Sequence, residues 1–494
     1  MDDLRTDRPS LSRRDLLTHG VRAAAGLSLL GALGGAGAFA APSALRTLPA
    51  GSFGRAKRCI FLFMFGGPSQ MDLFDYKPEL QARDGQTVDI ERRVGDVRKS
   101  VILGSKRSFR QFGETGQWCS DALPHLSAHM DRLAVIKSLH TDSFAHGSAV
   151  LKMNSGEIRQ GFPCMGSWVS YGRGSENDQL PGFVVMHDPR GGPISGPANW
   201  SSGFIPGEHQ GTLLRAAGQP LLDLAPAASN LRRQLPIEAR EEQLALLRTL
   251  NEWHQASRPA RTDLRARQLS YELARAMQDS AREALDLERE DEETLRLYGI
   301  SEPSQADHPM SLGSAPFGRQ CLIARRLMER GVRFVQLYHG GGHQQQTWDA
   351  HHGVEENLSI HCPEIDRPIA GLLSDLDRTG LLDETLVVWG GEFGRQPVSQ
   401  SGGEFQVANA LGRDHNPKGF SMWLAGAGVA PGSYGETDEL GSEAVVNRHP
   451  VRDLHATVLH LMGLRHEQLT YRYGGLDRKL TGVREAHPIE GVLA

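Results

Sequence analysis

The sequence predicts an α/β protein with a largely parallel central sheet that helices cover on both faces. Two observations lead to this fold class. Several short runs are fully apolar and rich in β-branched and aromatic residues, as strands buried on both faces require. Amphipathic helical segments and short glycine turns separate these runs, an alternation that is typical of α/β domains.

Six strands are expected from apolar runs that end in a turn. In chain order they span residues 59–65, 133–140, 183–188, 333–339, 385–391 and 420–426. A helix is expected within 362–380, because its apolar residues recur on one face and Gly380 follows them. Residues 317–331 repeat this pattern directly before the fourth strand.

Two further segments differ from this alternation. Residues from about 226 to 298 are highly charged and helical in pattern, with no strand signal. We expect a helical insertion in the same domain, because no flexible linker isolates the segment. The loop 189–212 is long and rich in glycine and proline. This favours a loop that borders a functional site over a simple connection between two elements.

Composition is that of an ordinary globular enzyme. The 494 residues are 39% hydrophobic and 23% charged, with a formal net charge of −5. This balance gives no reason to expect a nucleic acid or an anionic membrane as a partner. The five cysteines are scattered without a C-x-x-C motif, and their odd number leaves at least one thiol outside any intrachain disulfide.

Residues 1–40 predict an export signal. Arg13 and Arg14 precede an apolar run rich in glycine and alanine, which ends in the small-x-small cleavage site AFA at 38–40. This pattern resembles a twin-arginine signal, so the mature domain is expected to span 41–494 and to be periplasmic or extracellular. An uncleaved membrane anchor is the alternative, but the run is only mildly hydrophobic. We therefore expect no stable membrane span after cleavage.

Polar residues gather where the predicted strands end, and ligands of open α/β sheets bind beyond the carboxyl ends of the strands. They are Ser69, Asp72 and Asp75 after the first strand, Thr141, Asp142, Ser143 and His146 after the second, His339, His343, Asp349, His351 and His352 after the fourth, Glu392 and Arg395 after the fifth, and Asp414 and His415 before the last.

Carboxylates and imidazoles with nearby hydroxyls form a ligand set that suits Zn, Mn or similar ions. A divalent ion there would polarise an ester oxygen and lower the pKa of a bound hydroxyl. For any single residue, a capping or turn role is the alternative. The motifs WDAHH (348–352) and RDH (413–415) together favour a metal site.

Several stretches resemble known families. RTGLLDETLVVWGGEFG (378–394) is similar to the LGL.D.TLVVFTSDHG stretch of sulfatases and their relatives in the alkaline phosphatase superfamily. DHNPKGFSMWLAGAG (414–428) resembles a stretch of the phosphomutases of that superfamily, and DLHATVLHLMGL (453–464) resembles its closing helix. The whole mature chain is similar to the exported proteins classed as domain of unknown function 1501. The recurrent motifs of that family that occur in this chain are GGPSQMDLFDYKP, GSWVSYGRGSEN, LPGFVV, WDAH, GGEFGR, GRDH and YRYGGLDRKLTGV.

This resemblance implies an alkaline-phosphatase-like three-layer sandwich and a set of metal ligands for Zn, Mn or Ca. Glu392 stands at the position of a metal-binding aspartate of the superfamily. Asp349 and His351 correspond to an earlier Asp/His ligand pair, with His352 as the alternative to His351, and His415 matches a late histidine ligand.

The departures from the superfamily pattern lie near the same positions. Phe393 stands where the relatives have a histidine or asparagine, and it cannot bind a metal. The first strand lacks an aspartate directly at its end, so Asp72, further along, is the candidate substitute. Asp414 is a further candidate because it belongs to the GRDH motif. These departures put a full two-metal site in doubt.

The nucleophile is implied by the same resemblance. TDSFAHGSA (141–149) is similar to the DSAASA run of the phosphatases, which makes Ser143 the candidate nucleophile. Thr141 and Ser148 are the alternatives, and His146 is expected to act as a base or a metal ligand. Arg395 is expected to hold an anionic substrate group through a forked hydrogen bond.

The expected function is metal-dependent hydrolysis of a phosphate or sulfate ester, with an anionic ester such as a sulfated or phosphorylated glycan as substrate. A formylglycine sulfatase is rejected, because residues 321–325 (CLIAR) have isoleucine where that motif needs proline or alanine. The alternative is a degenerate, non-catalytic member of the superfamily that binds an anionic glycan.

Overall fold

The structure is a computed structural model. It describes residues 48–214, 237–258, 283–301, 308–400 and 411–494, except residues 50 and 94, together with the isolated positions 264, 268 and 272. The predicted export signal and much of the predicted helical insertion lie outside these residues. In the described part of the chain, no helix has the length and apolarity that crossing a membrane requires.

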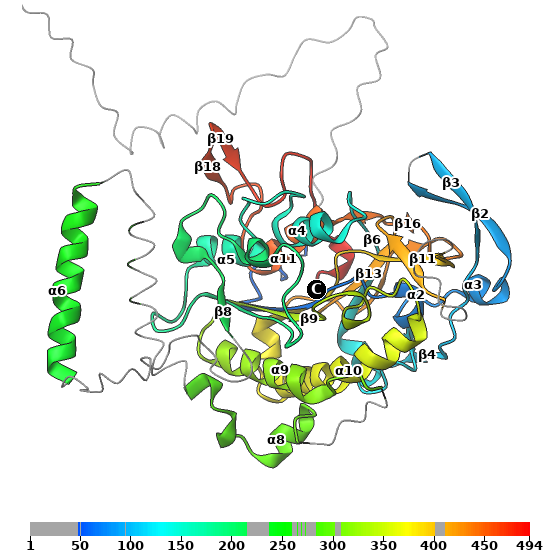
Figure 1. Cartoon of the computed structure of the whole chain (residues 1–494), viewed down its shortest axis with the longest axis horizontal. Coiled ribbons are helices and arrows are strands. Elements are labelled where there is room, and N and C mark those ends of the chain that lie inside the picture. The colour runs from blue at the N-terminus through cyan, green and yellow to red at the C-terminus, as the bar shows by residue number, and fades with distance from the viewer. Residues whose placement is uncertain are drawn as a thin grey trace, which may run out of the picture. The chain divides into compact units, whose positions relative to one another are not determined.

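A central sheet of nine strands organises the described residues (Figure 1). Its order is β14-β6-β13-β10-β1-β9-β7-β8, and β17 pairs with β6. The strands are β1 (Arg58–Met64), β6 (Leu133–His140), β7 (Phe183–Met186), β8 (Thr212–Leu214), β9 (Phe334–His339), β10 (Thr385–Gly390), β13 (Phe420–Gly426), β14 (Gly432–Tyr434) and β17 (His449–Pro450).

The six predicted strands all form and all belong to this sheet, as β1, β6, β7, β9, β10 and β13. Most neighbours pair in parallel, including β1 with both β9 and β10. Strand β13 is the exception, because it pairs antiparallel with β10 and with β6. The predicted α/β fold with a largely parallel central sheet is therefore confirmed.

Helices cover both faces of the sheet (Figure 1). One face carries α9 (Ser314–Glu329) and α10 (Val354–Arg378), which contain the two predicted helices. The other carries α4 (His146–Ser155), α5 (Met165–Arg173) and α11 (Val451–Leu461). The other α-helices of the described residues are α2 (Gln70–Leu73), α3 (Pro78–Ala82), α6 (Ile237–Ala256) and α8 (Glu292–Leu297), of which the last two lie in the predicted insertion.

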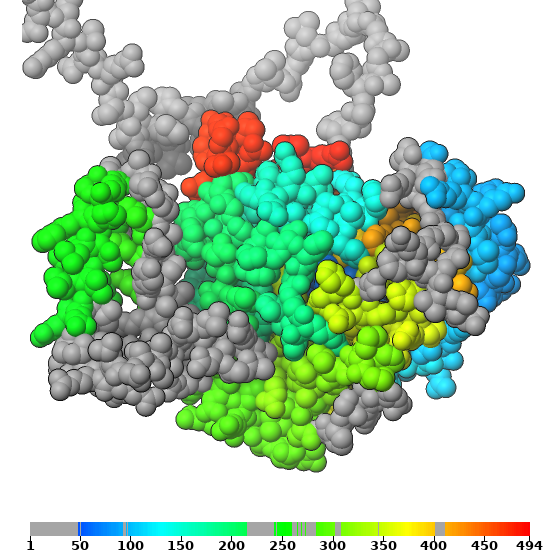
Figure 2. Space-filling view, viewed as in Figure 1, coloured from blue at the N-terminus to red at the C-terminus, as the bar shows by residue number. Residues whose placement is uncertain are grey.

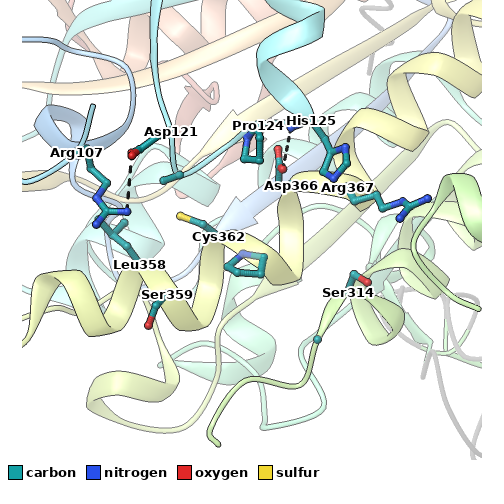
Figure 3. Close-up of a pocket in the computed structure, with 13 residues that line it drawn as sticks. Arg107, Asp121, Pro124, His125, Ser314, Leu358, Ser359, Cys362, Asp366 and Arg367 are labelled. Atoms are coloured by element: carbon teal, nitrogen blue, oxygen red, sulfur yellow. Dashed lines mark hydrogen bonds and ion pairs between the residues drawn. The ribbon is translucent and has the colours of Figure 1, made fainter. Parts of the chain in front are cut away.

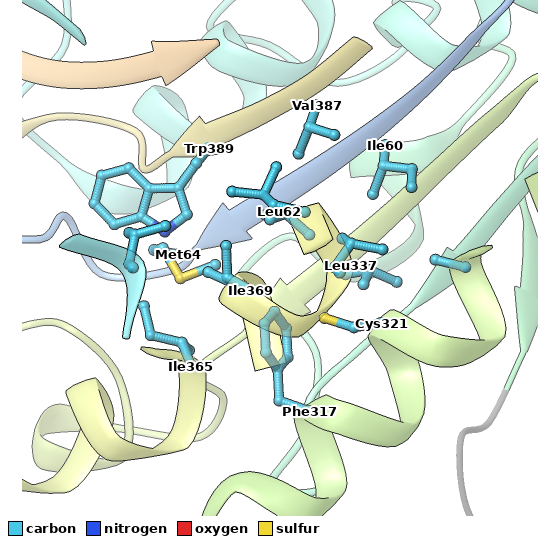
Figure 4. Packing of buried hydrophobic residues seen from close by; sticks show 14 of the residues in the cluster. Ile60, Leu62, Met64, Phe317, Cys321, Leu337, Ile365, Ile369, Val387 and Trp389 are labelled. Carbon is cyan, nitrogen blue, oxygen red and sulfur yellow. The ribbon is translucent and has the colours of Figure 1, made fainter. Parts of the chain in front are cut away.

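Strand β1 shows why both faces are closed. Ile60, Leu62 and Met64 point into a core with α9 and α10, where they meet Cys321 and Ile369 (Figure 4). The alternate side chains Cys59, Phe61 and Phe63 belong to a second core on the opposite face. Residues 59–64 are all buried and apolar, and only Arg58, at the start of the strand, is polar and partly exposed.

Short two-stranded sheets surround this framework. The pairs are β2 (Thr87–Arg93) with β3 (Asp96–Val101), β4 (Phe109–Phe112) with β5 (Gln117–Ser120), β11 (Gly394–Ser399) with β12 (Arg413–Asn416), β15 (Glu436–Thr437) with β16 (Ala444–Val446), and β18 (Tyr471–Tyr473) with β19 (Leu476–Arg478). In the space-filling view, yellow residues from the part of the chain after β9 are exposed beside the cyan-to-green residues of the α4–α5 part (Figure 2).

Candidate metal centre

Four candidate ligand side chains come from strand ends that share one edge of the sheet. Strands β6, β9 and β10 run in the same direction, so the segments that follow them meet. His146 is the first residue of α4, after β6, and Asp349 and His351 lie between β9 and α10. His415 lies on β12, which pairs with the strand that follows β10.

Three donor atoms form a compact triangle. Asp349 Oδ1 lies 2.9 Å from His351 Nε2 and 3.2 Å from His415 Nε2, and the two Nε2 atoms are 2.9 Å apart. Around a four-coordinate zinc ion, ligand atoms stand roughly 3.3 Å from one another, given metal–ligand distances near 2.0 Å. One carboxylate oxygen and two imidazole nitrogens in this arrangement fit a divalent cation.

The contacts of the Nδ1 atoms of His351 and His415 support a cation site at this triangle. His415 Nδ1 is 2.7 Å from the backbone oxygen of Phe144, and His351 Nδ1 contacts the side-chain oxygen of Gln400. Both partners are carbonyl oxygens, which accept hydrogen bonds, so both Nδ1 atoms carry the proton. In the neutral rings the facing Nε2 atoms are then bare lone pairs, which repel each other unless a cation lies between them.

His146 stands beside this triangle and is held by Glu392. Its Nδ1 atom is 2.6 Å from Glu392 Oε1, while its Nε2 atom is buried, has no hydrogen bond and lies 3.2 Å from Asp349 Oδ2. A carboxylate that binds the far nitrogen of a metal-binding histidine is a common way of orienting the ring. His146 is therefore a candidate fourth ligand, and Glu392 is the residue that would orient its ring.

Glu392 is fully buried at the end of β10 and is anchored by backbone as well. The amide of Gly66 donates to both of its carboxylate oxygens, at 3.1 and 3.2 Å. Position 66 must be glycine, because φ is +117° and a Cβ there would lie 2.6 Å from the amide nitrogens of Trp348 and Asp349. The glycine thus lets the backbone that carries Asp349 approach the end of β1.

Phe393 forms a wall of the site. Its ring centroid is 4.9 Å from that of His146 and 4.5 Å from that of His415. A Cβ at Gly67 would meet the Phe393 ring at 2.7 Å, so this glycine too makes room for the site. Phe393 packs against two candidate ligands, although it cannot bind metal itself.

Burial and charge act on these groups in opposite directions. Burial raises the pKa of Asp349, but the charge of Arg395 and the three neighbouring imidazoles outweigh it and hold the pKa well below its usual value. Burial lowers the pKa of His146, but Asp349 and Glu392 outweigh it and raise the pKa to about 9. Burial, assisted by Arg395 and His146, lowers the pKa of His415 to about 4. Without a metal at neutral pH, His146 is therefore charged and His415 is neutral.

Arg395 is fully buried, and its guanidinium points at the protein itself. It donates to Asp349 Oδ1 at 2.7 Å and to backbone oxygens of neighbouring segments. No ion pair joins it to Glu392, although both residues are described. In this placement the Arg395 guanidinium contacts other groups of the protein, whereas a contact with a substrate anion was expected from the sequence.

The other predicted site residues stand apart from the triangle. Asp72 is fully buried and pairs with Arg413 Nε at 2.9 Å. Ser143 Oγ lies 2.5 Å from Ser148 Oγ, in the loop that leads to α4. His352 contributes its backbone oxygen to Gln345, and Asp414 accepts from the amide of His415, with one oxygen 3.8 Å from His351 Nδ1.

A second cluster of histidines and a carboxylate has a different character. His339 Nε2 lies 2.9 Å from Glu364 Oε2, and His361 Nδ1 lies 3.3 Å from the same oxygen. The indole of Trp348 can only donate, and it donates to His339 Nδ1 at 3.0 Å. His339 Nε2 therefore carries the ring proton and donates a hydrogen bond to the Glu364 carboxylate. This pair is satisfied by hydrogen bonding and needs no metal.

A cavity of about 280 Å³ lies elsewhere, beside α10 (Figure 3). Cys362 and Asp366 line it, together with Arg107 and His125. The Asp366 carboxylate accepts hydrogen bonds from the backbone amides of His125 and Leu126, at 2.9 and 2.7 Å. It therefore stabilises the start of the short 3-10 helix Leu126–Arg132. The cavity contains none of the candidate metal ligands.

No sequence pattern indicated several of the residues that contact the site. The backbone oxygen of Phe144 and the side chain of Gln400 orient two ligands, yet neither has a residue type that marks metal chemistry. The pairing of Arg395 with Asp349 joins positions 46 residues apart, and no local pattern predicts it. The glycines of GGPSQ were the available clue that another segment approaches the end of β1.

Comparison with known proteins identifies the family. The family model described as Protein of unknown function (DUF1501) matches residues 56–493. The chain belongs to this family. A search of the curated proteins found no match.

Several solved structures are similar to this DUF1501 chain. A lipoteichoic acid synthase from Listeria monocytogenes has 9% identity and a TM-score of 0.38, over 90% of this chain and 79% of the other. A sulfatase from Pseudoalteromonas has 10% identity and a TM-score of 0.34, over 84% and 69%. An alkaline phosphatase from an Antarctic bacterium has 12% identity and a TM-score of 0.30, over 79% and 96%.

Proposed function

We propose that this protein is a metal-dependent hydrolase of phosphate or sulfate esters that acts outside the cytoplasm. The observation that carries the proposal is the triangle of Asp349 Oδ1, His351 Nε2 and His415 Nε2, with edges of 2.9 to 3.2 Å. Zinc and manganese both suit this donor set. A bound divalent ion would supply a Lewis acid that polarises an ester oxygen.

The charge of the site supports an anionic substrate. Asp349, Glu392 and Asp414, which lies 3.8 Å from His351 Nδ1, contribute three negative charges, and Arg395 contributes one positive charge. A divalent ion balances this total with all three imidazoles neutral. The two positive charges of the ion itself would then attract a phosphate or sulfate group. The motif resemblance to sulfatases and phosphatases supports the same substrate class.

The second candidate is a non-catalytic protein that binds an anionic glycan, and the setting of Ser143 favours it. In the described part of the chain, the Ser143 hydroxyl bonds with Ser148 Oγ at 2.5 Å and with atoms of Ala145 at 3.4 Å. A serine nucleophile needs a nearby base or metal to activate it. These local contacts supply neither.

One set of measurements separates the two functions. Purified wild type, Asp349→Asn and His415→Gln would be analysed for bound metal and assayed on nitrophenyl phosphate, nitrophenyl sulfate and a sulfated oligosaccharide. The hydrolase proposal expects metal and turnover in the wild type and loss of both in the two variants. Metal retained by the wild type without turnover, but with oligosaccharide binding, would favour the non-catalytic function. A wild type purified without metal, after expression with metals available, would contradict the metal centre.

A further inference from the structure

The guanidinium of Arg395 joins the segments that carry the candidate ligands. Its Nε donates to the backbone oxygen of Gly67 at 2.9 Å, at the end of β1. Its Nη1 donates to the backbone oxygen of Arg413 at 3.1 Å, on the strand that carries His415. Its Nη2 contacts the backbone oxygens of Gly66 and, at 3.3 Å, Trp348.

The same group sets the orientation of one ligand. Arg395 Nη2 lies 2.7 Å from Asp349 Oδ1, the oxygen that also faces His351 Nε2 and His415 Nε2. A carboxylate that is hydrogen-bonded in this way keeps one orientation, whereas a free one rotates about its last bond. Oxygen Oδ1 is thus presented to the position where the three donor atoms meet.

The position of Arg395 is itself fixed. Its amide donates to Gln70 Oε1 at 2.8 Å, and its backbone oxygen accepts from Gln70 Nε2 at 3.0 Å. The side chain is fully buried, and its donors are directed at protein oxygens. A buried guanidinium with these acceptors cannot also form the forked hydrogen bonds that bind a substrate anion.

We propose that Arg395 is a positioning residue of the metal centre, which fixes Asp349 and draws the end of β1, the turn before α10 and strand β12 together. The inference rests on the proposed metal centre, but it is independent of the reaction and of the substrate. Outer partners of metal ligands typically change metal affinity about tenfold to hundredfold when they are removed. Lysine cannot replace Arg395, because an ammonium is a compact donor and cannot reach oxygens on both sides of a planar fork.

The test compares Arg395→Lys with the matched control Arg333→Lys. Arg333 is also a buried arginine, and it bonds to Glu176 at 2.6 Å and to the backbone oxygen of Lys57 at 2.7 Å. It directly precedes β9, at the opposite end of the strand from Asp349. Both substitutions keep the positive charge, so neither changes the overall charge of the site.

Zinc affinity would be measured by competition with a chelator, and the visible spectrum of the cobalt-loaded protein would report ligand geometry. We expect Arg395→Lys to bind zinc about tenfold to hundredfold more weakly and to alter the cobalt spectrum. We expect Arg333→Lys to match the wild type in both, whatever its melting temperature. Wild-type affinity and spectrum in Arg395→Lys would overturn the inference, and a wild type without metal would instead overturn the metal centre.

A second variant covers the case in which Arg395→Lys does not fold. Gln70→Met removes the two hydrogen bonds that hold the backbone of Arg395, and a third to the backbone oxygen of Gly441, but keeps the arginine itself. We expect zinc affinity to fall severalfold in this variant, with a detectable change in the cobalt spectrum. Unchanged affinity and spectrum in folded Gln70→Met would also count against the inference.

Discussion

His351 Nε2 and His415 Nε2 face each other at 2.9 Å, and the far nitrogen of each ring is bonded to a carbonyl oxygen. Two lone pairs at this distance store repulsion that a proton or a metal ion relieves. Cation binding at the triangle they form with Asp349 would therefore be linked to protein stability.

Metal removal is expected to destabilise the protein. A ligand that binds only the folded state, at a free concentration a hundredfold above its Kd, adds about 2.7 kcal/mol to the free energy of unfolding. We expect a chelator to lower the melting temperature of the wild type and excess zinc to restore it. Asp349→Asn serves as the control, and a chelator effect of equal size in that variant would contradict a site at Asp349.

Glu392→Gln tests the support of His146. Glutamine keeps one acceptor oxygen for Gly66 but loses the charge that bonds to His146 Nδ1 at 2.6 Å. We expect metal affinity to fall about tenfold to hundredfold, and by less than in Asp349→Asn, because Glu392 acts through another side chain. Glu364→Gln is the matched control, since Glu364 is also buried and bonded to a histidine. Wild-type metal content and affinity in Glu392→Gln would leave this residue with no role at the metal centre.

The metal-free protein is expected to lose stability as the pH rises above neutrality. The pKa of His146 is raised to about 9, above its ordinary value of 6.5. A raised pKa contributes stability that is complete below pH 6.5 and is lost as the pH passes 9, with a full size on the order of 3 kcal/mol. Denaturant titrations of the chelated wild type and of His146→Gln at pH 6 and pH 9.5 measure this difference.

The stabilities of the two proteins should converge at the higher pH. His129→Gln is the control for this experiment, because burial lowers the pKa of His129, so the contribution of this group to stability does not fall as the pH rises. A gap between wild type and His146→Gln that stays constant with pH would contradict the assignment.

Ser143→Ala tests the nucleophile. If Ser143 attacks the ester, the variant should lose hydrolysis and keep its metal content and melting temperature nearly unchanged. Ser148→Ala is the control, because its hydroxyl lies 2.5 Å from Ser143 Oγ in the same loop. Full activity in Ser143→Ala would move the role to Thr141, Ser148 or a water molecule.

Export is tested at Arg13 and Arg14. Replacing both with lysine should leave a full-length precursor in the cytoplasm, because the twin-arginine route requires the arginine pair. Immunoblots of cytoplasmic and periplasmic fractions measure the distribution. Unchanged secretion of the double variant would rule out this route.

The strands were predictable because each is a largely apolar run, such as 59–65, and burial on both faces favours this pattern. The direction of β13 was not, since an apolar run reads alike in either direction. Asp349, His351 and His415 were expected to lie together because strand ends converge, and the structure brings them together. The pairings Arg395–Asp349 and His146–Glu392 required the folded chain, because they join residues 46 and 246 positions apart.

The reversed strand β13 bears on when the candidate metal centre can be completed. Because β13 runs against its neighbours, its beginning lies at the edge where the others end, and the candidate ligand His415 precedes it. The ring of His415 bonds to Phe144, 271 positions earlier in the chain. A nascent chain that has not yet placed its last strands therefore has only part of the candidate ligand set. The proposed ion would be captured late in folding, and its retention would mark a molecule whose chain has been assembled through to β13.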